Sequence, residues 1–205
     1  AYFSWLGGWT PFLPATSGFV GTTEITAPDN WHVTSQGIIQ EERVEVGSKT
    51  TTFKVTKPCY YSLMAAEYKY KKSQIGNIEF RTYFLDGSSD KHEFYEENLA
   101  KALRGIEKSY GPYPYDYLVV IQAPEIEGLR VLGSSEQGMM ALGKFASSDD
   151  YFNFPILVHE LAHMWFGNWV IGHEIAVSET FAQLGYFLAL EDVYGEEIMR
   201  RYILN

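Results

Sequence analysis

The chain has 205 residues, of which 46% are hydrophobic and 20% charged, and it is long enough for one large domain or two small ones. Its formal net charge is −10, which argues against a nucleic-acid-binding surface and favours cationic partners such as the ammonium group of a peptide. The single cysteine, Cys59, excludes an internal disulfide, so we expect it to be a small core residue.

The first 23 residues carry no charge, because the first charged residue is Glu24. Two prolines and four glycines interrupt this stretch, so we expect a loop-rich aromatic segment rather than a membrane helix. The chain opens with neither a methionine nor a signal peptide, which predicts a piece of a longer parent chain. The sequence leaves the compartment open.

The first third of the chain predicts β structure. Two short β-rich runs flank a turn at residues 28–30, and residues on either side of Gly47-Ser48 alternate between apolar and polar, as in a hairpin. Further strands are expected in YYSLMAAEYKY and NIEFRTYFL. The pattern then changes, so we expect the end of a β-rich domain over residues 1–74 and a second, mixed domain over residues 75–205.

The second part predicts helices mixed with strands, which makes the fold class α+β. Asp90 and Glu93 form a capping-box-like start for a helix that GPYPYDY ends, and YLVVIQ is typical of a short buried strand. After a strand and loop in GLRVLGSSEQGMMALGKF, three helices are expected. The first runs from about Asn153, as N-cap, to residue 166, with Pro155 in its first turn and Gly167 just past its end. The second runs over about 174–194 and is stopped by Gly195, and the third begins at about Glu196.

The sequence HELAH, residues 159–163, places two histidines four positions apart within an apolar run. Because positions i and i+4 share one face of a helix, His159 and His163 can direct ring nitrogens at one ion. Glu160 lies one step round the helix and can act as a general base on a water without being a ligand. Placing these groups on a buried helix without a metal would be costly, so we expect one zinc ion per chain.

A third ligand is expected further along the chain. Glu179, in SETFAQLGYF, lies on a different side of its predicted helix from the apolar residues that follow it. Glu174 stands at the expected helix start, where the helix dipole alone explains a glutamate, and His173 is a weaker rival at the same junction. The pattern favours Glu179 and leaves the other two open.

With these motifs in place, the sequence resembles the M1 family of zinc aminopeptidases, whose catalytic domain is thermolysin-like. HELAHMWFGNWV resembles that family's zinc helix, SETFA its third-ligand segment, and GSSEQ its exopeptidase motif. YGPYPYDYLVVIQAPE resembles the segment before that motif, and ITAPDNWHVTSQG the end of the family's N-terminal β-domain. The resemblance implies the C-terminal part of a β-sheet domain followed by the first part of a thermolysin-like zinc peptidase domain, with a mixed sheet and the HExxH helix.

The resemblance also implies roles for individual residues. It assigns zinc to His159, His163 and Glu179, and proton transfer to Glu160. It implies that Glu136 binds the free α-ammonium of a peptide substrate, with Gly133 and Gln137 in the same substrate-binding motif. The backbone over residues 133–135 would then lie alongside the peptide as an added strand.

Three features depart from the family pattern. Fewer residues separate His163 from Glu179 than in the family, and Ser135 and Gln137 stand where the exopeptidase motif has Met and Asn. The family's transition-state tyrosine belongs to a region past Asn205, and no tyrosine of this chain matches it. Because such an oxyanion donor is worth orders of magnitude in rate, the resemblance implies that the chain alone can bind zinc and still be nearly inactive.

Three functions therefore stay open. The leading one is a zinc metallo-aminopeptidase that releases N-terminal residues from peptides by metal-activated attack of water. A thermolysin-like endopeptidase would keep the metal without the amine site, and peptides with a blocked N-terminus discriminate between the two. The third is a non-catalytic, peptidase-like binding module of a larger parent protein, for which attachment to a membrane is one arrangement.

Overall fold

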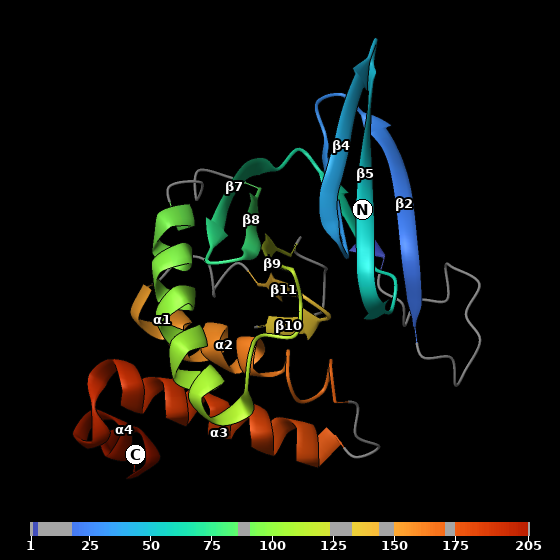
Figure 1. Cartoon of the computed structure of the whole chain (residues 1–205). Coiled ribbons are helices and arrows are strands. Elements are labelled where there is room, and N and C mark those ends of the chain that lie inside the picture. The colour runs from blue at the N-terminus through green and yellow to red at the C-terminus, as the bar shows by residue number, and fades with distance from the viewer. Residues whose placement is uncertain are drawn as a thin grey trace. The chain divides into compact units, whose positions relative to one another are not determined.

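The computed structural model describes residues 2–3, 18–85, 91–123, 133–143, 150–170 and 175–204 (Figure 1). It divides into two compact units that alternate along the chain. The first comprises Ala1–Ser89, Tyr115–Pro124 and Glu136–Met139, and the second comprises Asp90–Pro114, Glu125–Ser135 and Met140–Asn205. The described part contains three sheets and four helices, which confirms a mixed α+β fold. The division at residues 74 and 75 stays a prediction.

The first unit contains an antiparallel sheet of three long strands, which Figure 1 shows side by side. β5 (Ser48–Cys59) lies in the centre, between β2 (Phe19–Pro28) and β4 (Ile38–Glu45). The predicted hairpin at Gly47 is confirmed, because Glu45 of β4 pairs with Ser48 of β5. A small apolar cluster includes Phe53 of β5, which is fully buried.

A second sheet of this unit has the order β1–β6–β3, from Tyr2–Phe3, Leu63–Ala66 and His32–Ser35. The predicted turn before β3 is confirmed, because the Trp31 N–H donates to the Pro28 carbonyl at 2.9 Å. The single strand expected in YYSLMAAEYKY is wrong in detail. The chain turns where Tyr68 N–H donates to the Ala66 carbonyl, so this stretch supplies β6 and the start of β7 in a different sheet.

The third sheet has the order β10–β11–β9–β8–β7. Its strands are β7 (Lys69–Ile75), β8 (Ile78–Phe84), β9 (Tyr117–Gln122), β10 (Gly133–Glu136) and β11 (Met139–Leu142). β8 pairs with β7 antiparallel and with β9 parallel, so the sheet is mixed. Every residue of β9 is buried, as its continuous apolar sequence predicts. Residues 4–17 and 124–132 lie outside the described part of the chain.

The second unit is built from α1 (His92–Tyr110), α2 (Asp150–Ala162), α3 (Ile175–Tyr194) and α4 (Glu196–Leu204). α1 ends where the sequence predicts, because Gly111 takes a φ of 84° and its N–H caps the Glu107 carbonyl. Gly195 ends α3 in the same way. Asp90 of the expected capping box lies outside the described residues. Within the described helices, none is long and apolar enough to span a membrane.

The bounds of α2 differ from the prediction. Asn153 is not its N-cap, because the helix begins at Asp150 and Pro155 lies in its second turn. The proline ring fixes a φ that suits a helix, but it does not by itself mark the first turn. The regular helix also ends at Ala162, and the chain then turns towards Gly167.

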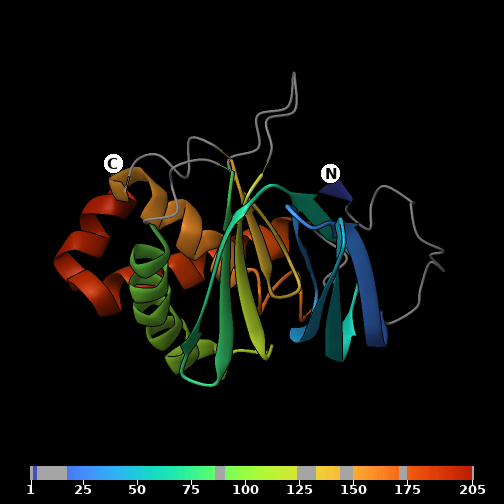
Figure 2. The same cartoon turned by 90° about the horizontal axis from the view of Figure 1, so that it is seen from above.

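Small residues let the helices of the second unit approach closely (Figure 2). A Cβ on Gly185 of α3 would lie 2.6 Å from the Ala162 Cβ of α2, and one on Gly105 of α1 would lie 2.9 Å from the Ala189 Cα of α3. The Tyr110 hydroxyl of α1 donates to the Phe181 carbonyl of α3 at 2.8 Å. These contacts fix α3 against α2, and therefore fix the groups that the two helices carry.

Candidate metal centre

The end of α2 brings two imidazoles together. His159 lies in its last turn, and the His163 N–H still donates to the His159 carbonyl at 3.3 Å, so the helical spacing persists one residue past the regular helix. The two ring centroids are 4.8 Å apart and the ring planes are nearly perpendicular, at 88°. Both rings therefore point to the same side, as the i, i+4 spacing predicts.

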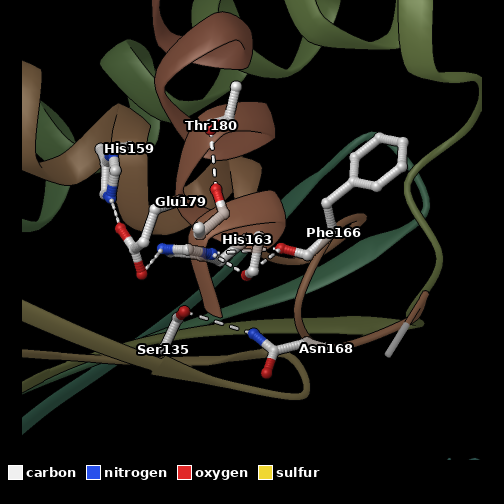
Figure 3. Close-up of polar contacts among 9 residues, drawn as sticks. Ser135, His159, His163, Phe166, Asn168, Glu179 and Thr180 are labelled. Atoms are coloured by element: carbon white, nitrogen blue, oxygen red, sulfur yellow. Dashed lines mark hydrogen bonds and ion pairs between the residues drawn. The ribbon is translucent and has the colours of Figure 1, made fainter. Parts of the chain in front are cut away.

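Glu179 reaches these rings from the second turn of α3 (Figure 3). Its Oε2 lies 3.1 Å from His159 Nε2, and its Oε1 lies 3.4 Å from His163 Nε2. The ligand-type atoms of these three residues all lie within 4.8 Å of one another. The rivals His173 and Glu174 lie outside the described residues. The structure thus brings the favoured glutamate to the two histidines.

The other ring nitrogen of His163 is held by the chain itself. Nδ1 lies 3.1 Å from the Phe166 carbonyl and 3.2 Å from the Ser178 hydroxyl. Because a carbonyl can only accept, this contact places the hydrogen on Nδ1 and leaves the lone pair on Nε2, which faces Glu179. Burial lowers the pKa of His163, which also favours the neutral ring that a metal requires.

The turn after α2 depends on a glycine. Gly167 takes a φ of 117°, and a Cβ there would lie 2.5 Å from Ser178 Oγ and 3.2 Å from His163 Nδ1. A side chain at this position would therefore displace the group that orients His163. Gly167 therefore does more than end the helix, because the absence of a side chain leaves room for Ser178 to contact His163.

Glu160 lies beside the cluster but is not part of it. Only 8% of its surface is exposed, and burial raises its pKa to about 7, while a hydrogen bond from Ser135 acts in the opposite direction. The charge of Glu179 raises the pKa further. A carboxyl group tuned to near neutral pH is suited to proton transfer, because it can both take up and release a proton there.

The donor set fits zinc. Two imidazole nitrogens and one carboxylate are the protein ligands of catalytic zinc sites, which leave a further coordination position open. Calcium and magnesium prefer all-oxygen sites, so the two imidazoles argue against them. The fit rests on the convergence of Nε2 of His159, Nε2 of His163 and the Glu179 carboxylate.

No family model matches the chain. Among curated proteins, it is 30% identical over 162 residues to "Aminopeptidase 2, mitochondrial" of Saccharomyces cerevisiae, an alignment that covers 72% of this chain. Among solved structures, it resembles the M1 zinc metallopeptidase of Deinococcus radiodurans, with a TM-score of 0.64 and 24% identity over 83% of this chain. A variant of that peptidase bound to a Tyr-Ser-Ala substrate gives a TM-score of 0.65 at 22% identity over 85% of this chain. The chain belongs to the M1 family.

The M1 chain covers only part of these relatives. It spans 16% of the length of the yeast protein and 40% to 41% of the solved chains. At these identities the solved structures establish a shared fold, and the curated relative shows similarity at the level of sequence to a protein named as an aminopeptidase.

The exopeptidase-like motif of this M1 chain lies on β10 and the turn that follows it. The Ser62 hydroxyl donates a hydrogen bond to Oε2 of Glu136. Gln137 is buried, its Oε1 accepts from the Tyr60 N–H at 3.4 Å, and its carbonyl accepts from the Tyr117 hydroxyl at 2.9 Å. These contacts all lie within the first unit, whereas Gly133 belongs to the second, where it adjoins Glu160.

Sequence reasoning missed the residues that support the named ones. Ser178 directly precedes Glu179, and Ser135 stands inside the exopeptidase-like motif. Their closeness in sequence to predicted site residues was a signal that could have identified both as hydrogen-bonding supports. Ser62 is 74 residues away from Glu136 in the chain. No local pattern could have connected those two.

Proposed function

We propose that this M1 chain carries the centre of a zinc-dependent metallopeptidase that acts as an aminopeptidase and releases N-terminal residues from peptides. The observation that carries the proposal is the convergence of His159, His163 and Glu179 within 4.8 Å, with the buried Glu160 beside them. The name of the yeast relative, an aminopeptidase, and the Tyr-Ser-Ala substrate of the Deinococcus variant support a peptide as the substrate class.

Zinc would be held by Nε2 of His159, Nε2 of His163 and the carboxylate of Glu179. When bound, it supplies Lewis-acid chemistry, which polarises a carbonyl and makes a water more acidic. The chain's own contribution is to keep the donors in the required state. The Phe166 carbonyl holds the hydrogen of His163 on Nδ1, and α3 carries the carboxylate to the rings of α2.

Glu160 moves the protons of the reaction. Its carboxylate takes a proton from the attacking water and delivers it to the nitrogen of the leaving amine. Burial supports this role, because it raises the pKa of the group to about 7 and so makes both the uptake and the release accessible near neutral pH.

Glu136 would set the position of the cut. A carboxylate that pairs with the free α-ammonium of the peptide fixes the substrate by its first residue, so that the bond after this residue is presented. The Ser62 hydroxyl bonds one carboxylate oxygen and so limits the rotation of the side chain. The net charge of −10 supports a cationic substrate end, because it favours the approach of positive charge.

The test combines metal analysis with two classes of substrate. The whole chain, reconstituted with zinc, should retain about one zinc per molecule and cleave a panel of free aminoacyl-anilides, while Nα-acetylated versions stay uncut. Glu160→Gln should keep the zinc and lose hydrolysis by at least about a hundredfold.

Each other outcome points to a different function. Absence of zinc after reconstitution would remove the metal centre. Cleavage of acetylated peptides would identify an endopeptidase. Zinc retention with peptide binding and no cleavage, in this chain and in any longer protein that contains it, would identify a binding module.

A further inference from the structure

The side chain of Ser135 in β10 lies between two side chains that belong to the metal-binding segment. Asn168 Nδ2 donates to Ser135 Oγ at 3.3 Å (Figure 3), and Ser135 in turn shares a hydrogen bond with the carboxylate of Glu160. Because the amide nitrogen can only donate, the serine oxygen accepts on that side, and its own hydrogen is available for the carboxylate. The bond to Ser135 lowers the pKa of Glu160, as donation to the charged carboxylate does, so the hydrogen bonds run from Asn168 through Ser135 to Glu160.

Asn168 is itself firmly placed. Its backbone N–H donates to the His163 carbonyl at 3.0 Å, and its side-chain nitrogen also faces the Met164 sulfur at 3.9 Å. The donor that orients Ser135 thus belongs to the turn that follows the two histidines. A hydroxyl held from this turn keeps its direction relative to Glu160, because backbone hydrogen bonds from Asn168 to His163 and from His163 to His159 tie the turn to the end of the helix that carries Glu160.

Gly133 makes room for the same carboxylate. A Cβ at this position would lie 2.7 Å from Glu160 Oε1 and 2.9 Å from its Cγ. Residues i and i+2 of a strand face the same side, so Gly133 and Ser135 present one face of β10. On that face the glycine leaves the space that Glu160 fills, and the serine supplies the donor.

We propose that Ser135 is a positioning residue that holds the carboxylate of Glu160 in its working orientation, with Asn168 orienting the serine hydroxyl. The inference rests on the proposed function only in treating Glu160 as the general base. A methionine, which the family pattern has at this position, offers no hydrogen to donate, so the arrangement is a property of this chain. The serine at this position of the motif then has a function, which is to fix the orientation of the Glu160 carboxylate.

The test uses the whole zinc-loaded chain and three single variants. Ser135→Ala should lower kcat about tenfold with KM changed less than about twofold, because the hydroxyl acts on the base rather than on the substrate. Ser135→Thr, which keeps the hydroxyl, should restore kcat to within about threefold of the parent chain. Thr26→Ala is the matched control, because it removes an exposed hydroxyl that pairs with Thr50, and it should change neither constant.

A second measurement does not depend on activity. In the zinc-free chain labelled with ¹³C at glutamate side chains, the Glu160 carboxyl signal is assigned by its absence in Glu160→Gln. It should shift in Ser135→Ala, return in Ser135→Thr and stay in place in Thr26→Ala. An unmoved Glu160 signal in Ser135→Ala would overturn the inference, as would a kcat in Ser135→Ala equal to that of the parent. If Glu160→Gln itself keeps full activity while the signal still shifts, the proposed function fails and the hydrogen bond stands.

Discussion

The metal cluster and the exopeptidase-like motif reach their geometry by opposite routes. The cluster joins neighbours on one helix end to a residue in the next helix, and its members contact one another directly. The motif residues Glu136 and Gln137 are instead tied to partners that are distant in sequence, Ser62 and Tyr60. We infer that zinc affinity depends on all three residues of the cluster. Substitutions in the motif should instead change KM by smaller amounts, because several contacts share the positioning of its residues.

The largest effect on zinc affinity is expected when the carboxylate that α3 contributes to the cluster is removed. Glu179→Ala leaves two imidazoles and no carboxylate, so zinc affinity should fall by more than about a hundredfold, beyond what the loss of an outer contact costs. Competition with a chromogenic chelator measures it. Glu191→Ala, an exposed glutamate on the same helix, is the matched control and should leave the affinity unchanged.

The same titration discriminates between the candidate third ligands. If Glu174→Ala or His173→Ala lowered zinc affinity as much as expected for Glu179, while Glu179→Ala did not, the ligand set would have to be reassigned. The contacts of Glu179 with His159 and His163 give the reason to expect the reverse.

A substitution in the exopeptidase-like motif should have a smaller effect than the loss of Glu179. Glu136→Gln keeps the shape of the side chain and removes its charge, so KM for substrates with a free N-terminus should rise between about ten- and a hundredfold. Zinc affinity should be unchanged, because Glu136 is not one of the three clustered residues. Steady-state kinetics on free peptides, with acetylated peptides added as competitive inhibitors, checks this. A rise in the inhibition constant of acetylated peptides equal to the rise in KM would show that the charge does not recognise the ammonium group.

The helices show how far the sequence alone can specify the site. The spacing of His159 and His163, the choice of Glu179 and the glycine stops at residues 111 and 195 are local patterns, and the structure has the corresponding elements and contacts. The start of α2 was wrong by three residues, because a proline restricts the backbone without marking the first turn.

The contacts that cross between strands were beyond local reasoning. The split of YYSLMAAEYKY between two sheets depends on which strands pair, and the pairing of Ser62 with Glu136 depends on the register of elements 74 residues apart. Period-2 patterns predict that a segment is a strand and say nothing about its neighbour. A supporting residue such as Ser62 is found only once the strands are assembled.

The close approach of α2 and α3 links stability to the cluster. In Gly185→Ala the new methyl group would lie 2.6 Å from the Ala162 Cβ, so the helices must separate, at a cost of about 1–3 kcal/mol. Gln183→Ala, an exposed change on the same helix, should cost almost nothing. Thermal unfolding of the zinc-free chain measures both. A Gly185→Ala chain as stable as the parent would mean that this contact does not hold α3 in place.

The smallest effect is expected from Ser62→Ala, and it tests whether the motif is really supported from a distance. The backbone of Ser62 is held independently, because its N–H donates to Gln36 Oε1 at 2.8 Å and its carbonyl accepts from the Ser35 hydroxyl at 2.8 Å. Removing the hydroxyl should therefore affect only its hydrogen bond to Glu136 and raise KM by about two- to tenfold, the range of one hydrogen bond. In the double variant with Glu136→Gln the two effects should not add, because both act on one contact. Full additivity would mean that Ser62 influences substrate binding without Glu136. The inference that Ser62 helps to position Glu136 would then be wrong.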